Sequence, residues 1–180
     1  MIIRDAVPAD AEAIAQIYNE SIAAGDCALV ERLQTSADIL GWMASFNERE
    51  TILVLEEDGC VLGWGIIKRY SEREGYRYTC ETSVYLRRGQ RGRGYGPMIK
   101  QALIERCRQY GYHHLVAKLF ADNEACLKYN QKFGYELVGV QKEIGYKNGQ
   151  WMDVAILQLL LPDESSNIDA TKNLPAGETD

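Results

Sequence analysis

Hydrophobic residues follow two periods along the chain, and their succession predicts a mixed α and β fold. Spacings of three and four residues predict helices after Asp10, after Ser36, over 97–110 and within 121–135. Apolar and β-branched runs predict strands over 2–6, 51–57, 60–70, 79–86, 113–120, 135–147 and 151–161. The order β-α-α-β-β-β-α-β-α-β-β favours an α+β fold of the α/β/α sandwich type, with a mixed, mostly antiparallel central sheet flanked by helices.

Turn and cap residues mark the ends of these segments. Asp58-Gly59 and Asn148-Gly149 each separate two strands, and both supply the positive φ angles of a tight hairpin turn. Gly111 is expected to end the helix that starts near Pro97. The predicted N-cap residues of the other helices are Asp10, Ser36 and either Asp122 or Asn123. The predicted apolar side of the helix 97–110 consists of Met98, Leu103, Ile104 and Cys107.

A strand, a glycine-rich loop and a helix start follow one another at residues 79–97. The loop RRGQRGRGYG holds four arginines and four glycines. Glycines let the backbone approach an anion, and the N–H groups at a helix N-terminus attract one. Pro97 suits the first turn because it has no N–H. We therefore predict a phosphate cradle, with the flexible basic loop as the alternative; the letters fit neither GxGxxG nor the P-loop.

Composition and charge exclude several classes of protein. The chain has 180 residues, 46% hydrophobic, which fits one domain over residues 1–161. Residues 162–180 hold five acids and one lysine and are expected to form a disordered acidic tail. No apolar run suits a membrane span, and Arg4 and Asp5 stand where a signal peptide would be apolar, so we expect a cytoplasmic protein.

Cysteine and histidine usage predicts neither a disulfide framework nor a metal site. The five cysteines are odd in number and include no CxxC pair, and the two histidines are adjacent. Cys80 alternates with Glu81 and points to the other strand face, and Cys126 lies on an apolar helix face. Because neither cysteine lies in a convincing nucleophile site, an acylated enzyme is not expected.

The sequence resembles the GNAT superfamily of acyl-CoA-dependent N-acetyltransferases. The resemblance rests on the RxxGxG pattern of Arg91, Gly94 and Gly96, on the stretch DNEACLKYNQKFGY, and on the order of elements from residue 2 to about 161. IYNESI, YRYTCETSVYL and GYKNGQWMDVAILQ resemble the phosphinothricin and methionine-sulfone group. This implies acetyl-CoA as donor, a primary amine of an amino acid or analogue as small-molecule acceptor, and a homodimer formed through the C-terminal hairpin.

The resemblance also implies cofactor contacts. The pantetheine arm would pair with the strand 79–86 and the pyrophosphate would lie on the loop. The residues implied are Val84, Tyr85, Leu86, Arg91, Gly92, Arg93, Gly94, Tyr95, Gly96, Pro97 and Asn123. Asn123 can cap a helix as well as contact the pantetheine.

Two residues are catalytic candidates. Glu81 matches an acidic residue of the group and would serve as general base, directly or through water; an exposed strand carboxylate is the alternative. Tyr129 stands where many members protonate the thiolate, but it shares a helical face with apolar residues and could be a cofactor contact or a core tyrosine. Asn130 replaces a histidine of the herbicide-inactivating members, and Tyr70 replaces a tryptophan of the acceptor pocket.

The acceptor site is expected at the loop before this strand. Arg77 can bind a carboxylate through two parallel hydrogen bonds, although a solvated arginine is the alternative. The predicted acceptor residues are Glu74, Gly75, Tyr76, Arg77 and Val84.

Other functions remain open alternatives. A polyamine or a protein N-terminus could be the acceptor, and the chain could bind acyl-CoA without turnover. RNA binding through RRGQRGRG is a further alternative, but the segment is short and the rest of the chain is acidic. We therefore expect neither nucleic acid nor a membrane as a partner.

Overall fold

The helices and strands follow one another in the order that the hydrophobic spacing predicted. The computed structural model describes residues 1–25 and 29–162, so the acidic tail after Pro162 lies outside the described residues. The strands are β1 (Ile2–Asp5), β2 (Thr51–Glu57), β3 (Cys60–Arg69), β4 (Thr79–Leu86), β5 (His114–Phe120), β6 (Glu136–Lys147) and β7 (Gln150–Leu160). The helices are α1 (Ala11–Ala24), α2 (Ser36–Ser45), α3 (Tyr95–Gln109) and α4 (Glu124–Gln131).

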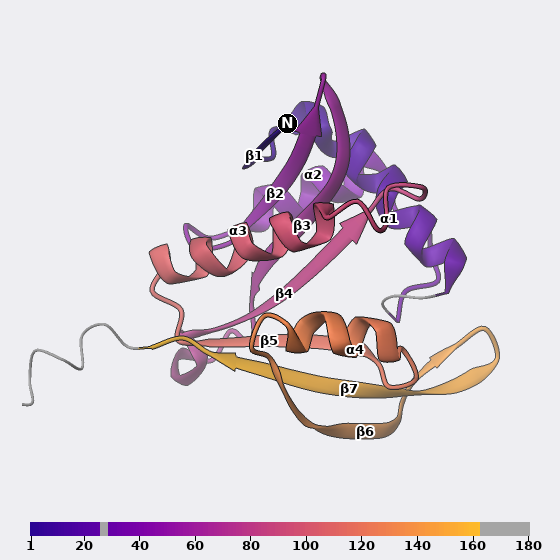
Figure 1. Ribbon diagram of the computed structural model, residues 1–180, viewed down its shortest axis with the longest axis vertical. Helices are drawn as coiled ribbons and strands as arrows, with labels where there is room; N and C mark the ends of the chain where they lie inside the picture. The colour runs from indigo at the N-terminus through magenta and orange to yellow at the C-terminus, as the bar shows by residue number, and fades with distance from the viewer. Residues whose placement is uncertain (26–28, 163–180) are drawn as a thin grey trace, which may run out of the picture.

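The strands form one seven-stranded sheet in the order β1-β2-β3-β4-β5-β7-β6. All neighbours are antiparallel except β4 and β5, and this confirms the predicted mixed, mostly antiparallel sheet. The parallel pair is short, because only Thr79–Glu81 pairs with 114–116. Beyond that point β4 and β5 diverge (Figure 1). The split leaves backbone groups of both strands without a neighbouring strand.

Helices cover both faces of the sheet (Figure 1). α1 and α2 pack on one face, around the buried Ile14, Ile39 and Trp64. α3 packs on the other face with Ile99 and Leu103, and α4 adds partly buried residues to the same cluster. The sheet therefore separates two hydrophobic cores.

Both hairpin predictions are confirmed, and one cap prediction was wrong by one residue. Asp58 and Asn148 have φ angles of 50° and 49°, and a positive-φ glycine follows each. Thr35, not Ser36, caps α2, in a capping box with Asp38. Asn123 caps α4 through the N–H of Cys126.

At α1 the predicted residue takes the N-cap position without a side-chain cap bond, and at α3 one predicted apolar residue was wrong. Asp10 precedes α1, but its carboxylate binds the Arg4 side chain at 2.7 Å and the Val7 N–H instead of capping the helix. Met98 is 42% exposed, so it does not belong to the apolar side of α3; Ile99 occupies that side instead.

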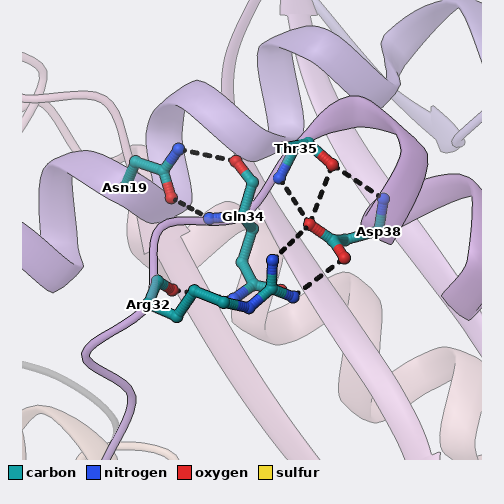
Figure 2. Close-up of polar contacts among 5 residues, drawn as sticks. All are labelled: Asn19, Arg32, Gln34, Thr35 and Asp38. Carbon is teal, nitrogen blue, oxygen red and sulfur yellow. Dashed lines mark hydrogen bonds and ion pairs between the residues drawn. The ribbon is translucent and has the colours of Figure 1, made fainter.

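Hydrogen bonds fix the connection between α1 and α2 (Figure 2). The Asn19 side chain donates to the Gln34 carbonyl oxygen at 2.8 Å and accepts from the Gln34 N–H at 2.8 Å. The Arg32 guanidinium donates to the Asp38 carboxylate at 2.8 Å. This hydrogen bond, together with those from Thr35, holds the pKa of the Asp38 carboxyl well below its usual range. The segment 29–35 is thereby attached to both helices.

The far end of the β6–β7 hairpin packs on the same segment. Any side chain at Gly145 would collide with Leu29. The Asn148 N–H donates to the Glu31 carboxylate at 2.6 Å. None of the helices in residues 1–25 and 29–162 is long and apolar enough to span a membrane.

Candidate active site

The split between β4 and β5 opens into a cavity of about 480 Å³. Glu81, Ser83 and Tyr85 line it from one face of β4, and Thr82 and Val84 line it from the other. The remaining lining residues are Tyr18, Leu29, Val30, Trp42, Trp64, Ile66, Lys68, Lys100, Ala117, Lys118, Leu119, Phe120, Cys126, Tyr129, Asn130 and Val154. The cavity therefore connects the α1–α2 side of the sheet with the α3–α4 side.

Glu81 lies in this cavity and is paired with a lysine. The Lys118 Nζ is 2.7 Å from the Glu81 carboxylate, and the two side chains are 41% and 33% exposed. The ammonium of Lys118 also lies 5.4 Å from the ring centre of Tyr70. The carboxylate is thus oriented by a neighbouring strand and remains open to water.

An aromatic wall lines the cavity on the α1–α2 side. The ring of Tyr18 meets Trp42, Trp64 and Tyr85 edge-on, with centroids 4.8–5.8 Å apart. The ammonium of Lys68 lies 5.5 Å from the Trp42 ring centre. Such a wall suits a small organic molecule with an apolar part.

Residues of α4 line the opposite side. The Tyr129 hydroxyl donates to the Gly96 carbonyl oxygen at 2.8 Å, and burial raises the pKa of Tyr129 above its usual value. Asn130 is 5% exposed and donates to the Cys126 carbonyl oxygen at 2.9 Å, within its own helix. Tyr129 and Glu81 thus line the same cavity from opposite sides, and Asn130 is a buried helix residue.

Sequence reasoning missed a buried lysine of this cavity. Lys100 on α3 is 2% exposed, and its Nζ lies 3.3 Å from the Thr82 hydroxyl and 4.0 Å from the ring centre of Tyr135. Burial lowers the pKa of Lys100 to about 8. The signal was present, because Lys100 precedes Leu103, Ile104 and Cys107 by three, four and seven positions and so shares their buried face.

The loop before α3 has the geometry predicted for an anion cradle. Gly89, Gly92 and Gly94 have φ angles of 80–84°, and a Cβ on any of them would meet open space in the described structure. Gly94 is the N-cap of α3 and carries no side chain to cap its N–H groups. Pro97 lies in the first turn. The residues present therefore fit a phosphate group at the helix N-terminus.

Of the predicted acceptor residues, only Val84, on β4, lines the main cavity; the loop residues 74–77 lie outside it. Glu74, Tyr76 and Arg77 line a separate hollow of about 170 Å³, together with three further arginines at positions 49, 69 and 73. The Tyr76 ring lies 5.4 Å from that of Tyr70, which is next to Lys118. The loop is thus connected to the Glu81–Lys118 pair through Tyr70.

The described cysteines lie in the core, at the cavity and, in the case of Cys60, at the surface. The Sγ atoms of Cys80 and Cys107 are 3.6 Å apart in the core, and their hydrogen bond, with burial, raises the pKa of Cys80. Cys126 faces the cavity, and the buried polar Asn130 contacts it one turn further along α4. Cys27 lies outside the described residues.

Comparisons with known proteins show the family of the chain. The acetyltransferase (GNAT) domain family matches residues 3–156. An L-methionine sulfoximine/L-methionine sulfone acetyltransferase of Pseudomonas paraeruginosa is 36% identical over 96% of this chain and 98% of its own length.

Two solved structures have the same fold. A ribosomal-protein-alanine N-acetyltransferase of Brucella melitensis has a TM-score of 0.86 and 31% identity, over 89% of this chain and all of its own. A phosphinothricin acetyltransferase of Sinorhizobium meliloti, solved with acetyl-CoA, has a TM-score of 0.83 and 30% identity, over 89% of this chain and 88% of its own. The chain therefore belongs to the GNAT family of acetyltransferases, whose acetyl donor is acetyl-CoA.

Proposed function

We propose that the chain transfers the acetyl group of acetyl-CoA directly to the primary amine of an amino acid or amino-acid analogue. The observation that carries this proposal is the cavity at the β4–β5 split, which is open to both sides of the sheet and has Glu81 on its wall. A donor entering from the α3–α4 side and an acceptor entering from the α1–α2 side would meet beside this carboxylate.

The donor is proposed to follow β4. The positive-φ glycines and the uncapped start of α3 suit its pyrophosphate, with Arg91 and Arg93 in the surrounding loop. The backbone of Val84–Leu86 lies where β4 has separated from β5, so the pantetheine arm could hydrogen-bond there as an added strand. An N–H of this stretch would polarise the thioester carbonyl.

The residues of the chain have separate tasks in this reaction. Glu81, held by Lys118, accepts a proton from the acceptor amine, directly or through water. The neutral amine attacks the thioester carbon and the C–N bond forms. The nitrogen gives up its second proton to water, and the C–S bond breaks with its electron pair leaving on the sulfur. Tyr129 is better suited to holding the donor than to giving up its proton, because its hydroxyl is engaged by Gly96 and its pKa is raised.

The acceptor class is supported by the cavity wall and by the names of relatives. The aromatic residues around Tyr18 suit the side chain of a small amino-acid analogue, and the similar Pseudomonas protein is named for two such analogues. A protein N-terminus is the second candidate, because the similar Brucella protein is named for a ribosomal-protein alanine.

A screen for release of the CoA thiol tests the proposal. Methionine sulfone, methionine sulfoximine, phosphinothricin, other amino acids, polyamines and alanine-ended peptides are each incubated with the enzyme and acetyl-CoA. We expect turnover with the amino-acid analogues. Turnover with peptides or polyamines alone would reject the proposed acceptor class. Acetyl bound to Cys126 in the absence of amine would reject direct transfer.

Glu81→Gln tests the base. We expect turnover at saturating acetyl-CoA to fall by roughly a hundredfold or more, the usual size of a lost general base, with acetyl-CoA affinity nearly unchanged. Glu136→Gln, at an exposed position at the start of β6, is the matched control and should retain activity. Unchanged turnover in Glu81→Gln would remove this residue from the role.

We also propose a cytoplasmic homodimer that requires neither nucleic acid nor a membrane. The exposed apolar residues of the edge strand β6, Leu137, Val138, Val140, Ile144 and Tyr146, support a second copy of the chain as the partner.

A further inference from the structure

Lys100 is a charged group that the reaction described above does not use. It is 2% exposed and lines the cavity on the α3–α4 side. An ammonium has three N–H donors, and the described residues give Lys100 one side-chain oxygen, at 3.3 Å, and the face of one aromatic ring. A buried cation with so few partners is costly unless a bound group completes its environment.

The groups around Lys100 contain no carboxylate that pairs with it in the described part of the chain. Its ionisable neighbours are the thiols of Cys80, Cys107 and Cys126 and the phenol of Tyr135. Glu81 follows the opposite face of β4 and pairs with Lys118. The positive charge of Lys100 is therefore available to a negative group that enters the cavity.

The position on β4 that the Lys100 side chain reaches indicates which negative group would bind it. Thr82, its hydrogen-bond partner, is adjacent to Glu81 but points to the other face of the strand. At one level of β4, therefore, a carboxylate lies on the acceptor side and an ammonium lies on the donor side. In the proposed reaction the thioester would lie between these two groups, with its departing sulfur on the side of Lys100.

We propose that Lys100 is a further catalytic residue, whose ammonium stabilises and protonates the CoA thiolate as the thioester breaks. This inference rests on the proposed function for the direction from which the donor enters. As the C–S bond breaks, the sulfur keeps the electron pair and takes a proton from Nζ. Lys100 is left neutral and regains its proton from water when CoA leaves.

The acidity of Lys100 is suited to this step. A thiol has a pKa of about 8.5 and burial lowers the pKa of Lys100 to about 8, so proton transfer between them is nearly balanced. Tyr129 is a weaker acid, and its proton is already donated to Gly96.

Binding of free CoA tests the proposal without any acceptor. The affinities of CoA and of desulfo-CoA, which lacks only the sulfur, are measured from pH 7 to 9 with the wild type and with Lys100→Met. We expect the wild type to prefer CoA by roughly tenfold or more near the thiol pKa, as for a charge-assisted hydrogen bond, and Lys100→Met to lose this preference. Thiolate absorbance should show a lower thiol pKa for CoA bound to the wild type than to Lys100→Met.

Lys68→Met is the matched control, because it removes the same charge from the other side of the cavity. It should keep the preference for CoA over desulfo-CoA. In turnover, Lys100→Met should lower kcat with little change in KM for acetyl-CoA, and should shift or remove the fall of activity above about pH 8.

Two results would overturn the inference. One is an equal preference for CoA in the wild type and in Lys100→Met. The other is acetyl on Lys100 in the peptide masses after incubation with acetyl-CoA, because the amine would then be a nucleophile. A Lys100-dependent preference for CoA without acetylation of any amino acid would reject the proposed acceptor and leave this inference standing.

Discussion

At the scale of single residues, burial changes the chemistry of Lys100 and Tyr129 in ways that the sequence conveys only indirectly. The spacing of three, four and seven residues places Lys100 on the apolar face of α3. Because lysines usually reach solvent, the residue type favours an exposed amine despite this spacing. The resemblance made Glu81 a candidate, and it does line the cavity, whereas its partner Lys118 lies 37 positions away in the sequence. Pairing of distant residues depends on the strand order, which local patterns do not contain.

The lowered pKa of Lys100 predicts a pH-dependent stability difference. Below pH 8 the buried ammonium opposes folding, and between about 8 and 10.5 the unfolded chain binds a proton that the folded chain does not. The free energy of unfolding of the wild type should therefore rise with pH relative to Lys100→Met, by at most about 3 kcal/mol.

Urea unfolding of both proteins at pH 7.5 and pH 10 measures this difference. Comparing the two proteins cancels the titration of the other lysines, tyrosines and cysteines. Lys100→Met should be the more stable protein at pH 7.5, and the gap should narrow at pH 10. A gap independent of pH would show that Lys100 has an ordinary pKa.

At the scale of elements, the hairpin turns were the most predictable features. Asp58-Gly59 and Asn148-Gly149 determine their hairpins locally, through backbone angles that few other residues adopt. The true cap of α2 also had a local signal, the Thr35–Asp38 capping box. The split between β4 and β5 had none, because it depends on which strands become neighbours.

Gly94→Val tests the loop before α3. The β-branched side chain would strain the positive φ and project toward the proposed phosphate position, so acetyl-CoA affinity should fall by roughly tenfold or more. Gly111→Val introduces the same strain after the C-terminal end of α3, where φ is 70°. Both should lose about 1–2 kcal/mol of stability, and only Gly94→Val should weaken the donor. Equal acetyl-CoA affinities of Gly94→Val and the wild type, measured by calorimetry, would exclude the phosphate cradle.

Asn19→Ala tests the segment 29–35 at the cavity. Removing the two hydrogen bonds to Gln34 should loosen Leu29 and Val30, which line the acceptor side. We expect KM for the acceptor to rise by roughly three- to tenfold with KM for acetyl-CoA unchanged. Gln16→Ala, on the exposed side of the same helix, is the control. An unchanged acceptor KM would separate this segment from acceptor binding.

At the scale of the whole molecule, residues from both cores meet in one cavity. Tyr18, Trp64, Lys100 and Tyr129 come from four elements, and the gap in the sheet brings them together. The resemblance to the GNAT superfamily implied the reaction and its donor. The walls of the cavity required the three-dimensional arrangement.

The proposed dimer can be tested at the edge strand β6. Val138→Lys, at a position 60% exposed, should convert the proposed dimer into a monomer in sedimentation velocity. Ile2→Lys, on the opposite edge strand β1, where the residue is 54% exposed, should leave the assembly unchanged. Identical sedimentation of wild type and Val138→Lys would place the interface elsewhere or reject it.

The contact of Gly145 with Leu29 has a consequence for communication within the molecule. Leu29 lines the cavity, and Gly145 and Asn148 hold its segment from the β6–β7 hairpin. A partner that shifts the hairpin would therefore also shift a wall of the cavity. Acceptor affinity and association between copies would then be thermodynamically linked, so each would change the other by the same factor.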